Sequence, residues 1–264
     1  MKLDYGTQLS PLPVKLSIGS IRKPTLRDIA ELSFEKFTYY EFLARLKPEQ
    51  YYTEINGEEG KLYLDSLDEE TRQSLNFFSI FQEDDDLKEA YIELLNYFFV
   101  ENVIFKEGII IILKDGIEDI DETNIENLQG VITKETLPQV LEIIQQICCI
   151  YSEEEKIENI KFKNKIARQM YEKMQKAQRE KKKKLDLNLT IPNIISALSN
   201  KHPSLNYLNI WDLTVFQLFD AFSRVQVNSI FDIDSNRVSV WGDEKKTFDP
   251  SLWFKNEYDK KSVI

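Results

Sequence analysis

Apolar residues recur at a helical period through much of the chain. They stand every three or four positions from Ile29 to Leu46, a spacing that places them on one face of an α-helix. Thr25 and Asp28 have the spacing of a capping box just before this segment, and Pro48 follows it. The pattern predicts one helix between these signals.

Acidic residues mark the starts of two more predicted helices. Asp68 can cap a helix that reaches Phe81, and the triplet Asp84 to Asp86 can cap a helix that reaches Phe99. The acidic run Glu83 to Asp86 has neither the repeated ligand spacing nor the glycine of a calcium loop. We therefore interpret its carboxylates as helix-start residues and not as a metal site.

Alternating and β-branched runs predict short strands. Val14 to Ile18 alternates, and a glycine turn at Gly108 separates two β-branched runs within residues 103–113, which is typical of a hairpin. The glycines within residues 49–67 favour a turn between short extended pieces. Residues 230–241 alternate again and predict a strand or hairpin.

Two helices are predicted near the middle of the chain. Thr133 and Thr136 precede a helix that tolerates Pro138 in its first turn. Ser152, followed by a glutamate three residues later, opens a long helix that runs into a lysine cluster. Its apolar stripe fades toward these lysines, so we expect a linker at residues 178–189.

Residues 190–226 predict two capped amphipathic helices, over residues 192–200 and 212–225. The second helix carries an aromatic stripe. Such a stripe either packs in the core or anchors a partner, and the sequence alone leaves both interpretations open. The candidate partner-binding residues of this module are Trp211, Phe216, Phe219 and Phe222.

Composition favours helix over a many-stranded sandwich. The chain has 264 residues, 42% of them hydrophobic, with only eight glycines and eight prolines. We expect a mainly α fold of the α+β class, a helical bundle with a short β-hairpin and a small C-terminal helical and aromatic module. The expected domains are an N-terminal helical domain at 1–150, a long helix with a basic linker at 151–189, and the C-terminal module at 190–264.

Charge is unevenly distributed. The segment from Lys156 to Lys184 holds twelve Lys and Arg against three Glu, a charge of +9, which leaves −20 for the rest of a chain whose formal charge is −11. This asymmetry indicates either electrostatic association, with an acidic partner or a second copy, or a solvated helix face. The candidate partner contacts here are Lys181, Lys182, Lys183 and Lys184.

Residues with reactive side chains are few. His202 is the only histidine, and beside Pro203 it is expected to cap a carbonyl at a helix end. Cys148 and Cys149 are adjacent, which disfavours a disulfide between them, so we interpret them as buried thiols in a reducing compartment. The sequence has no phosphate-binding, dinucleotide-binding or zinc motif. We expect no enzymatic activity, no cofactor and no metal.

The stretch KHPSLNYLNIWDLTVFQLFD, residues 201–220, resembles uncharacterised proteins from tailed phages and prophages of Gram-positive bacteria. The acidic, helical plan with a basic linker and a short aromatic C-terminal module is similar to that of tail assembly chaperones, which bind the tape measure protein before the tail tube polymerises. The resemblance covers the C-terminal module well and the rest of the chain only in overall plan. It implies a phage structural or tape measure protein as partner, and a location in the host cytoplasm or on the virion.

Two functions are consistent with these observations. The first is a non-enzymatic phage assembly or virion protein, tail assembly chaperone-like, that binds another phage protein. The alternative is a nucleic-acid-binding regulator that uses the basic segment against phosphates, since Lys and Arg there interleave with aromatic residues. No membrane partner is expected, because the sequence has no secretory signal and no apolar run of about eighteen residues.

Overall fold

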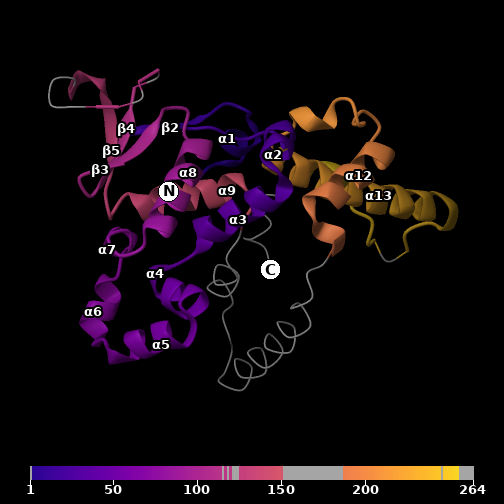
Figure 1. Cartoon of the computed structure of the whole chain (residues 1–264). Helices are drawn as coiled ribbons and strands as arrows, with labels where there is room; N and C mark the ends of the chain where they lie inside the picture. Colours follow the sequence, from indigo (N-terminus) through magenta and orange to yellow (C-terminus); the bar gives the residue numbers. More distant parts are fainter. Residues whose placement is uncertain are drawn as a thin grey trace. The chain divides into compact units, whose positions relative to one another are not determined.

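The computed structural model describes residues 2–114, 116–117, 119–120, 125–150, 187–244 and 246–255. The chain divides into two compact units, one of Met1–Ile150 with Thr214–Phe216 and one of Tyr151–Leu213 with Gln217–Ile264. Its described part is mainly α-helical with two small sheets (Figure 1), which confirms the expected fold class. The long helix predicted from Ser152 lies outside the described residues.

The first unit holds nine of the labelled helices. They are α1 (Tyr5–Leu9), α2 (Leu26–Leu32), α3 (Phe34–Arg45), α4 (Pro48–Gln50), α5 (Gly57–Ser66), α6 (Glu69–Ser74), α7 (Phe77–Ile80), α8 (Asp85–Phe98) and α9 (Leu137–Ile147). Most are short, because capping residues and glycines interrupt the apolar pattern.

The capping box at Thr25 and Asp28 is confirmed. The backbone N–H of Thr25 donates to the Asp28 carboxylate at 2.7 Å, and the N–H of Asp28 donates to the Thr25 hydroxyl at 3.2 Å. The single helix predicted from there to Leu46 is wrong. Ser33 has φ 92° and separates α2 from α3, and its hydroxyl then caps α3 by accepting from the N–H of Lys36 at 3.2 Å.

Acidic caps start the next helices as predicted. The Asp68 carboxylate accepts from the N–H of Thr71 at 2.7 Å, and the Asp84 carboxylate accepts from the N–H of Leu87 at 2.8 Å. The helix from Asp84 extends to Phe98, close to its predicted end. The helix from Asp68 was predicted to reach Phe81 but is interrupted after six residues.

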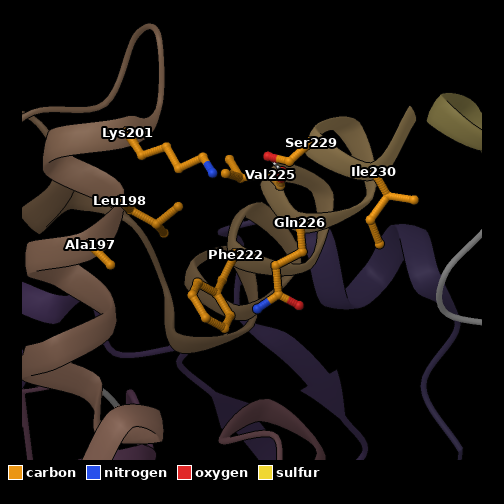
Figure 2. Close-up of a pocket in the computed structure, with 8 residues that line it drawn as sticks. All are labelled: Ala197, Leu198, Lys201, Phe222, Val225, Gln226, Ser229 and Ile230. Carbon is orange, nitrogen blue, oxygen red and sulfur yellow. Dashed lines mark hydrogen bonds between the residues drawn. The ribbon is translucent and has the colours of Figure 1, made fainter. Parts of the chain in front are cut away.

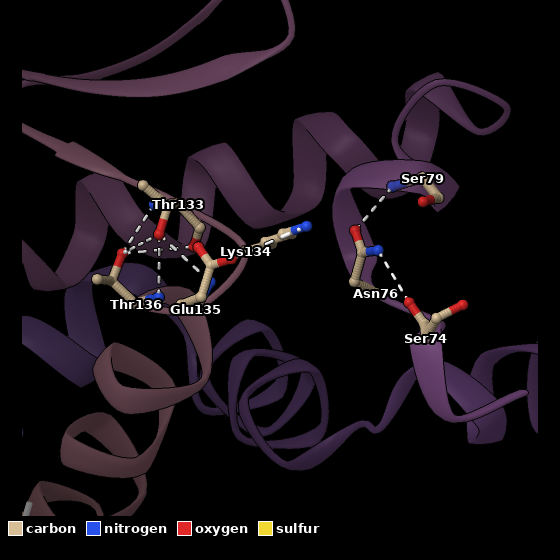
Figure 3. Close-up of polar contacts among 7 residues, drawn as sticks. All are labelled: Ser74, Asn76, Ser79, Thr133, Lys134, Glu135 and Thr136. Carbon is tan, nitrogen blue, oxygen red and sulfur yellow. Dashed lines mark hydrogen bonds and ion pairs between the residues drawn. The ribbon is translucent and has the colours of Figure 1, made fainter. Parts of the chain in front are cut away.

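A side-chain cap also starts α7, and side-chain hydrogen bonds hold the turn before α9 (Figure 3). Asn76 accepts from the N–H of Ser79 at 3.2 Å, so a new helix begins where the sequence predicts a continuous one. At α9, the N–H of Thr133 donates to the Thr136 hydroxyl at 2.7 Å, and the N–H of Thr136 donates back to the Thr133 hydroxyl at 3.3 Å. The predicted helix with Pro138 in its first turn is confirmed.

The extended pieces predicted for residues 49–67 are wrong, because this region is helical. A π-helical turn, η1 (Tyr51–Ile55), leads through Gly57, at φ 61°, into α5. A Cβ at Gly60 would lie 1.9 Å from the carbonyl oxygen of Tyr52. The glycines therefore permit a change of direction and a close approach between helical turns.

Both sheets of the first unit are antiparallel. The strands β1 (Val14–Leu16) and β2 (Gly19–Ile21) form a hairpin, and β3 (Val103–Lys106), β4 (Ile109–Leu113) and β5 (Leu128–Ile132) form a sheet in that order. The hairpin predicted at residues 103–113 is confirmed. Glu107 and Gly108 both have positive φ, as a type I′ turn requires. The sequence did not predict β2 or β5.

Tyr91 of α8 lies at the centre of the buried core of the first unit. Its ring lies 4.8 Å from that of Phe77 and 5.2 Å from that of Phe81, and its hydroxyl donates to the carbonyl oxygen of Leu43 at 2.9 Å. The Gln145 side chain donates to the carbonyl oxygen of Ala44 at 2.7 Å, which joins α9 to α3. These bonds satisfy polar groups in a core that is mainly apolar.

The two cysteines follow α9. Cys148 is buried, as predicted, and burial raises the pKa of its thiol well above the usual value. Cys149 is half-buried and has φ 57°.

The second unit is built from helices in its described part. It contains α12 (Ile191–Lys201), most of α13 (Val215–Trp241), and the 3-10 turns η3 (Leu187–Leu189), η4 (Ile210–Asp212) and η5 (Leu252–Phe254). The first predicted helix of this module is confirmed. The strand or hairpin predicted for residues 230–241 is wrong, because α13 continues to Trp241, where Gly242 at φ 75° ends it.

Replacing Gly130 of β5 with alanine should destabilise the protein. A Cβ there would lie 2.5 Å from the carbonyl oxygen of Ile18 in the β1–β2 turn, so backbone must move. We expect a loss of about 1–3 kcal/mol in the free energy of unfolding, measured by urea titration. The control is Gln129→Ala at the exposed neighbouring position. Equal stabilities of the two variants would contradict this packing.

Glu41 of α3 should make stability depend on pH. Burial raises the pKa of its carboxyl to about 7, although Arg45 nearby lowers it. Between the usual carboxyl pKa and 7, the folded protein holds a proton that the unfolded chain releases, so the contribution of Glu41 to stability falls as pH rises. Glu41→Gln should therefore be roughly 1–2 kcal/mol more stable than wild type at pH 8 and similar to it at pH 4.

Thermal and urea unfolding at both pH values measure this difference. Glu35→Gln, an exposed carboxylate on the same helix, is the control. A Glu41→Gln protein that gains no stability at pH 8 would show that the carboxyl is not buried.

Candidate functional site

An apolar groove lies between α12 and α13 in the second unit. It has a volume of about 430 Å³, and Figure 2 shows side chains of both helices facing it. The lining residues are Ala197, Leu198, Lys201, Phe222, Val225, Gln226, Ser229 and Ile230.

The ends of α12 are set by local sequence. Pro192 stands in its first turn, where a missing N–H costs nothing, and Thr190 precedes it in extended conformation. At the other end, Pro203 cannot continue the helix and holds His202 in an extended conformation, at φ −74° and ψ 136°. The helix is therefore eleven residues long, and its last turns line the groove.

Hydrogen bonds hold the connection from α12 toward α13. The Nδ1 of His202 accepts from the N–H groups of Ser204 at 3.2 Å and Leu205 at 3.1 Å. The Asn209 side chain accepts from the N–H of Asn206 at 2.8 Å and donates to the carbonyl oxygen of Ser204 at 2.9 Å. His202 lies at the C-cap of α12, as predicted, and its backbone N–H donates to the carbonyl oxygen of Leu198 at 2.8 Å. Its ring, in contrast, accepts from loop amides beyond the helix end.

The chemistry of the groove is that of a binding surface for apolar groups. The Ser229 hydroxyl donates to the carbonyl oxygen of Val225 at 2.7 Å within α13, which occupies its proton. Lys201 and Gln226 supply the long polar side chains, and the remaining wall is aliphatic or aromatic. Such a groove suits apolar side chains of a peptide or helix, with the Lys201 ammonium available to an acidic group beside them.

The four aromatic residues predicted to bind a partner lie in different surroundings and are buried to different extents. Phe222 lines the groove. Phe219 and Trp211 are half-buried, and the indole N–H of Trp211 donates to the carbonyl oxygen of Tyr207 at 3.0 Å. Phe216 is buried in the first unit, where its ring lies 6.0 Å from that of Tyr5. The predicted contacts Lys181, Lys182, Lys183 and Lys184 lie outside the described residues.

The groove-lining face of α13 continues beyond the groove as an exposed stripe. Gln226, Ile230, Ile233, Arg237 and Val240 follow one another at spacings of four, three, four and three, which keeps them on one side of a helix. The large apolar side chains of this stripe are exposed by 54% at Ile230, 69% at Ile233, 70% at Val240 and 81% at the adjacent Trp241. We call residues 230–241 of this face the distal stripe.

A second apolar face of α13 is covered. The ring of Phe231 lies 5.6 Å from that of Phe248, and Val238, seven residues after Phe231, is half-buried. Two apolar faces on one helix produce the alternation along residues 230–241 that predicted a strand. The strand prediction hid Ile230 from the groove, although the four-three spacing that continues past residue 226 was a usable signal. The other unpredicted groove residues lie in or beside the predicted helices, and which of them face the groove depends on how α12 and α13 pack.

The described residues contain no group of three or more His, Cys, Asp and Glu that could hold a metal ion. Within the same part of the chain, no helix combines the length and the apolar character needed to cross a lipid bilayer.

The groove and the distal stripe both fall within a stretch that is similar to a known domain. Residues 179–258 match the family described as YomV second domain. YomV is encoded by a Bacillus prophage, so this similarity links the chain to phage and prophage proteins. Neither the curated proteins nor the solved structures gave a match.

Filling the groove should prevent it from binding an apolar probe. Ala197 is exposed at the groove wall, so Ala197→Trp should occupy the space without disturbing the core. We expect wild type to bind the anionic dye anilinonaphthalene sulfonate with enhanced fluorescence, and the variant to bind about tenfold more weakly. Asn228→Trp, on the exposed opposite side of α13, is the control. Equal dye binding by both variants would contradict the groove.

Proposed function

We propose that the protein is a non-enzymatic phage assembly or virion protein, tail assembly chaperone-like, that binds another phage protein. The apolar groove between α12 and α13 is the observation that carries this proposal. It offers the partner an open apolar wall of two helices instead of a set of reactive side chains.

Two further observations support the proposal. The groove lies within the stretch similar to the YomV second domain, so the phage link and the binding surface coincide in the sequence. The groove wall also contains a large aromatic side chain, Phe222, flanked by aliphatic residues, which can pack against the apolar face of a partner helix. The partner we propose is an amphipathic helix of a phage structural or tape measure protein, bound in the host cytoplasm.

The basic segment would orient this partner. Residues 156–184 carry +9 within a chain that is otherwise acidic, so an acidic surface beside the partner's apolar face would be attracted to them. Lys201, which lines the groove, would likewise attract an acidic group of the partner.

A nucleic-acid-binding regulator is the second candidate, and the same +9 segment favours it. The phosphates of duplex DNA would contact Lys181 to Lys184, and the binding affinity would fall steeply as the salt concentration rises. Long-range repulsion from the −20 on the rest of the chain opposes that approach, which is why we place it second.

Direct binding to the tape measure protein of the same phage genome tests the proposal. We expect the full chain to bind it, Ala197→Trp to weaken binding by about tenfold or more, and Asn228→Trp to leave it unchanged. Replacing Lys181 to Lys184 with Glu should also weaken binding, with a marked salt dependence and no loss of fold.

Binding to duplex DNA measured in parallel separates the two candidates. Submicromolar affinity of the wild type for DNA in physiological salt, abolished by the lysine replacement, would establish the regulator instead. If Ala197→Trp bound the tape measure protein as tightly as the wild type does, the groove would not be the binding site.

A further inference from the structure

The distal stripe of α13 has more apolar surface than the described neighbours cover. Four large side chains, Ile230, Ile233, Val240 and Trp241, are each more than half exposed along less than four helical turns. Apolar residues at four-three spacing on one helix face are the pattern by which helices pack side by side. The stripe therefore has the form of a helix–helix interface.

The charges within the stripe are complementary to those of a second copy of the same helix. Asp234 and Arg237 lie near its middle, between Ile233 on one side and Val240 on the other, and they form an ion pair at 3.2 Å on their own helix. If two copies of the stripe pack antiparallel about a twofold axis near residue 235, Asp234 of each copy lies opposite Arg237 of the other. The same register places Ile230 of one copy beside Val240 and Trp241 of the other.

The same charges disfavour parallel packing of the two copies. It would bring Arg237 of one copy against Arg237 of the other, with Asp234 against Asp234, and like charges directly opposite are destabilising. The stripe is thus complementary to itself in the antiparallel direction, which is the requirement for a twofold-symmetric interface.

We propose that the distal stripe is the interface of an antiparallel homodimer formed through α13. Each dimer would then contain two α12–α13 grooves, and Ile230 of each groove would also take part in the dimer contact. Because the dimer contacts belong to this chain alone, their test needs no phage partner, and its failure is distinguishable from failure of the proposed function.

The test uses two single charge reversals in the full chain. Asp234→Arg places Arg opposite Arg in a homodimer, and Arg237→Asp places Asp opposite Asp. Each variant should dimerise about tenfold or more weakly than wild type, since the twofold axis repeats the repulsion. A mixture of the two variants restores Arg opposite Asp at both positions and should form a heterodimer. The pairs within each helix remain broken in the mixture, so recovery reports contacts between chains.

Sedimentation and native mass spectrometry measure these states, and circular dichroism verifies that each variant is folded. Asp232→Arg, an exposed charge reversal on another side of α13, is the matched control and should dimerise like the wild type. A wild-type protein that stays monomeric at high micromolar concentration would overturn the proposal. So would reversals that leave dimerisation unchanged, or a mixture that forms no heterodimer.

Discussion

One geometric constraint underlies the account of the second unit: α13 is much longer than the helix beside it. Its 27 residues span roughly 40 Å, whereas the eleven of α12 span roughly 16 Å. Phe222 and Val225 can therefore face α12 across a groove, but Ile233 and Val240 on the same side cannot. Apolar surface left beyond a short neighbour favours association, because burying it removes hydrocarbon from water.

The groove and the distal stripe thus have a common origin and different chemistry. The groove is bounded by two helices and has one cation, Lys201, which suits an apolar segment that also carries acid. The stripe has an acid and a base of its own, Asp234 and Arg237, which suit an identical helix in reverse. The two surfaces meet at Ile230, which lines the groove and begins the stripe, and otherwise use different residues of one helix.

Local signals in the sequence predicted helix starts well, because caps such as Thr25 with Asp28, or Asp84, act within four residues. Longer-range features were not predictable in this way. The close approach of Gly60 to Tyr52 and the addition of β5 to the hairpin depend on segments that meet only after folding. At the candidate site, Phe222 was predicted as a partner contact, but the groove also depends on the packing of α12 beside residues 222–230 of α13, which local signals do not indicate.

The central claim is that residues 215–241 form one continuous helix, on which both the groove and the stripe depend. Backbone ¹³C chemical shifts of the full chain test it most directly, since they report the conformation of each residue independently of partners. The account predicts helical shifts without interruption through residues 226–241, up to the glycine at 242. Extended-strand shifts across residues 230–241 would contradict it and would remove the distal stripe, together with the contribution of Ile230 to the groove.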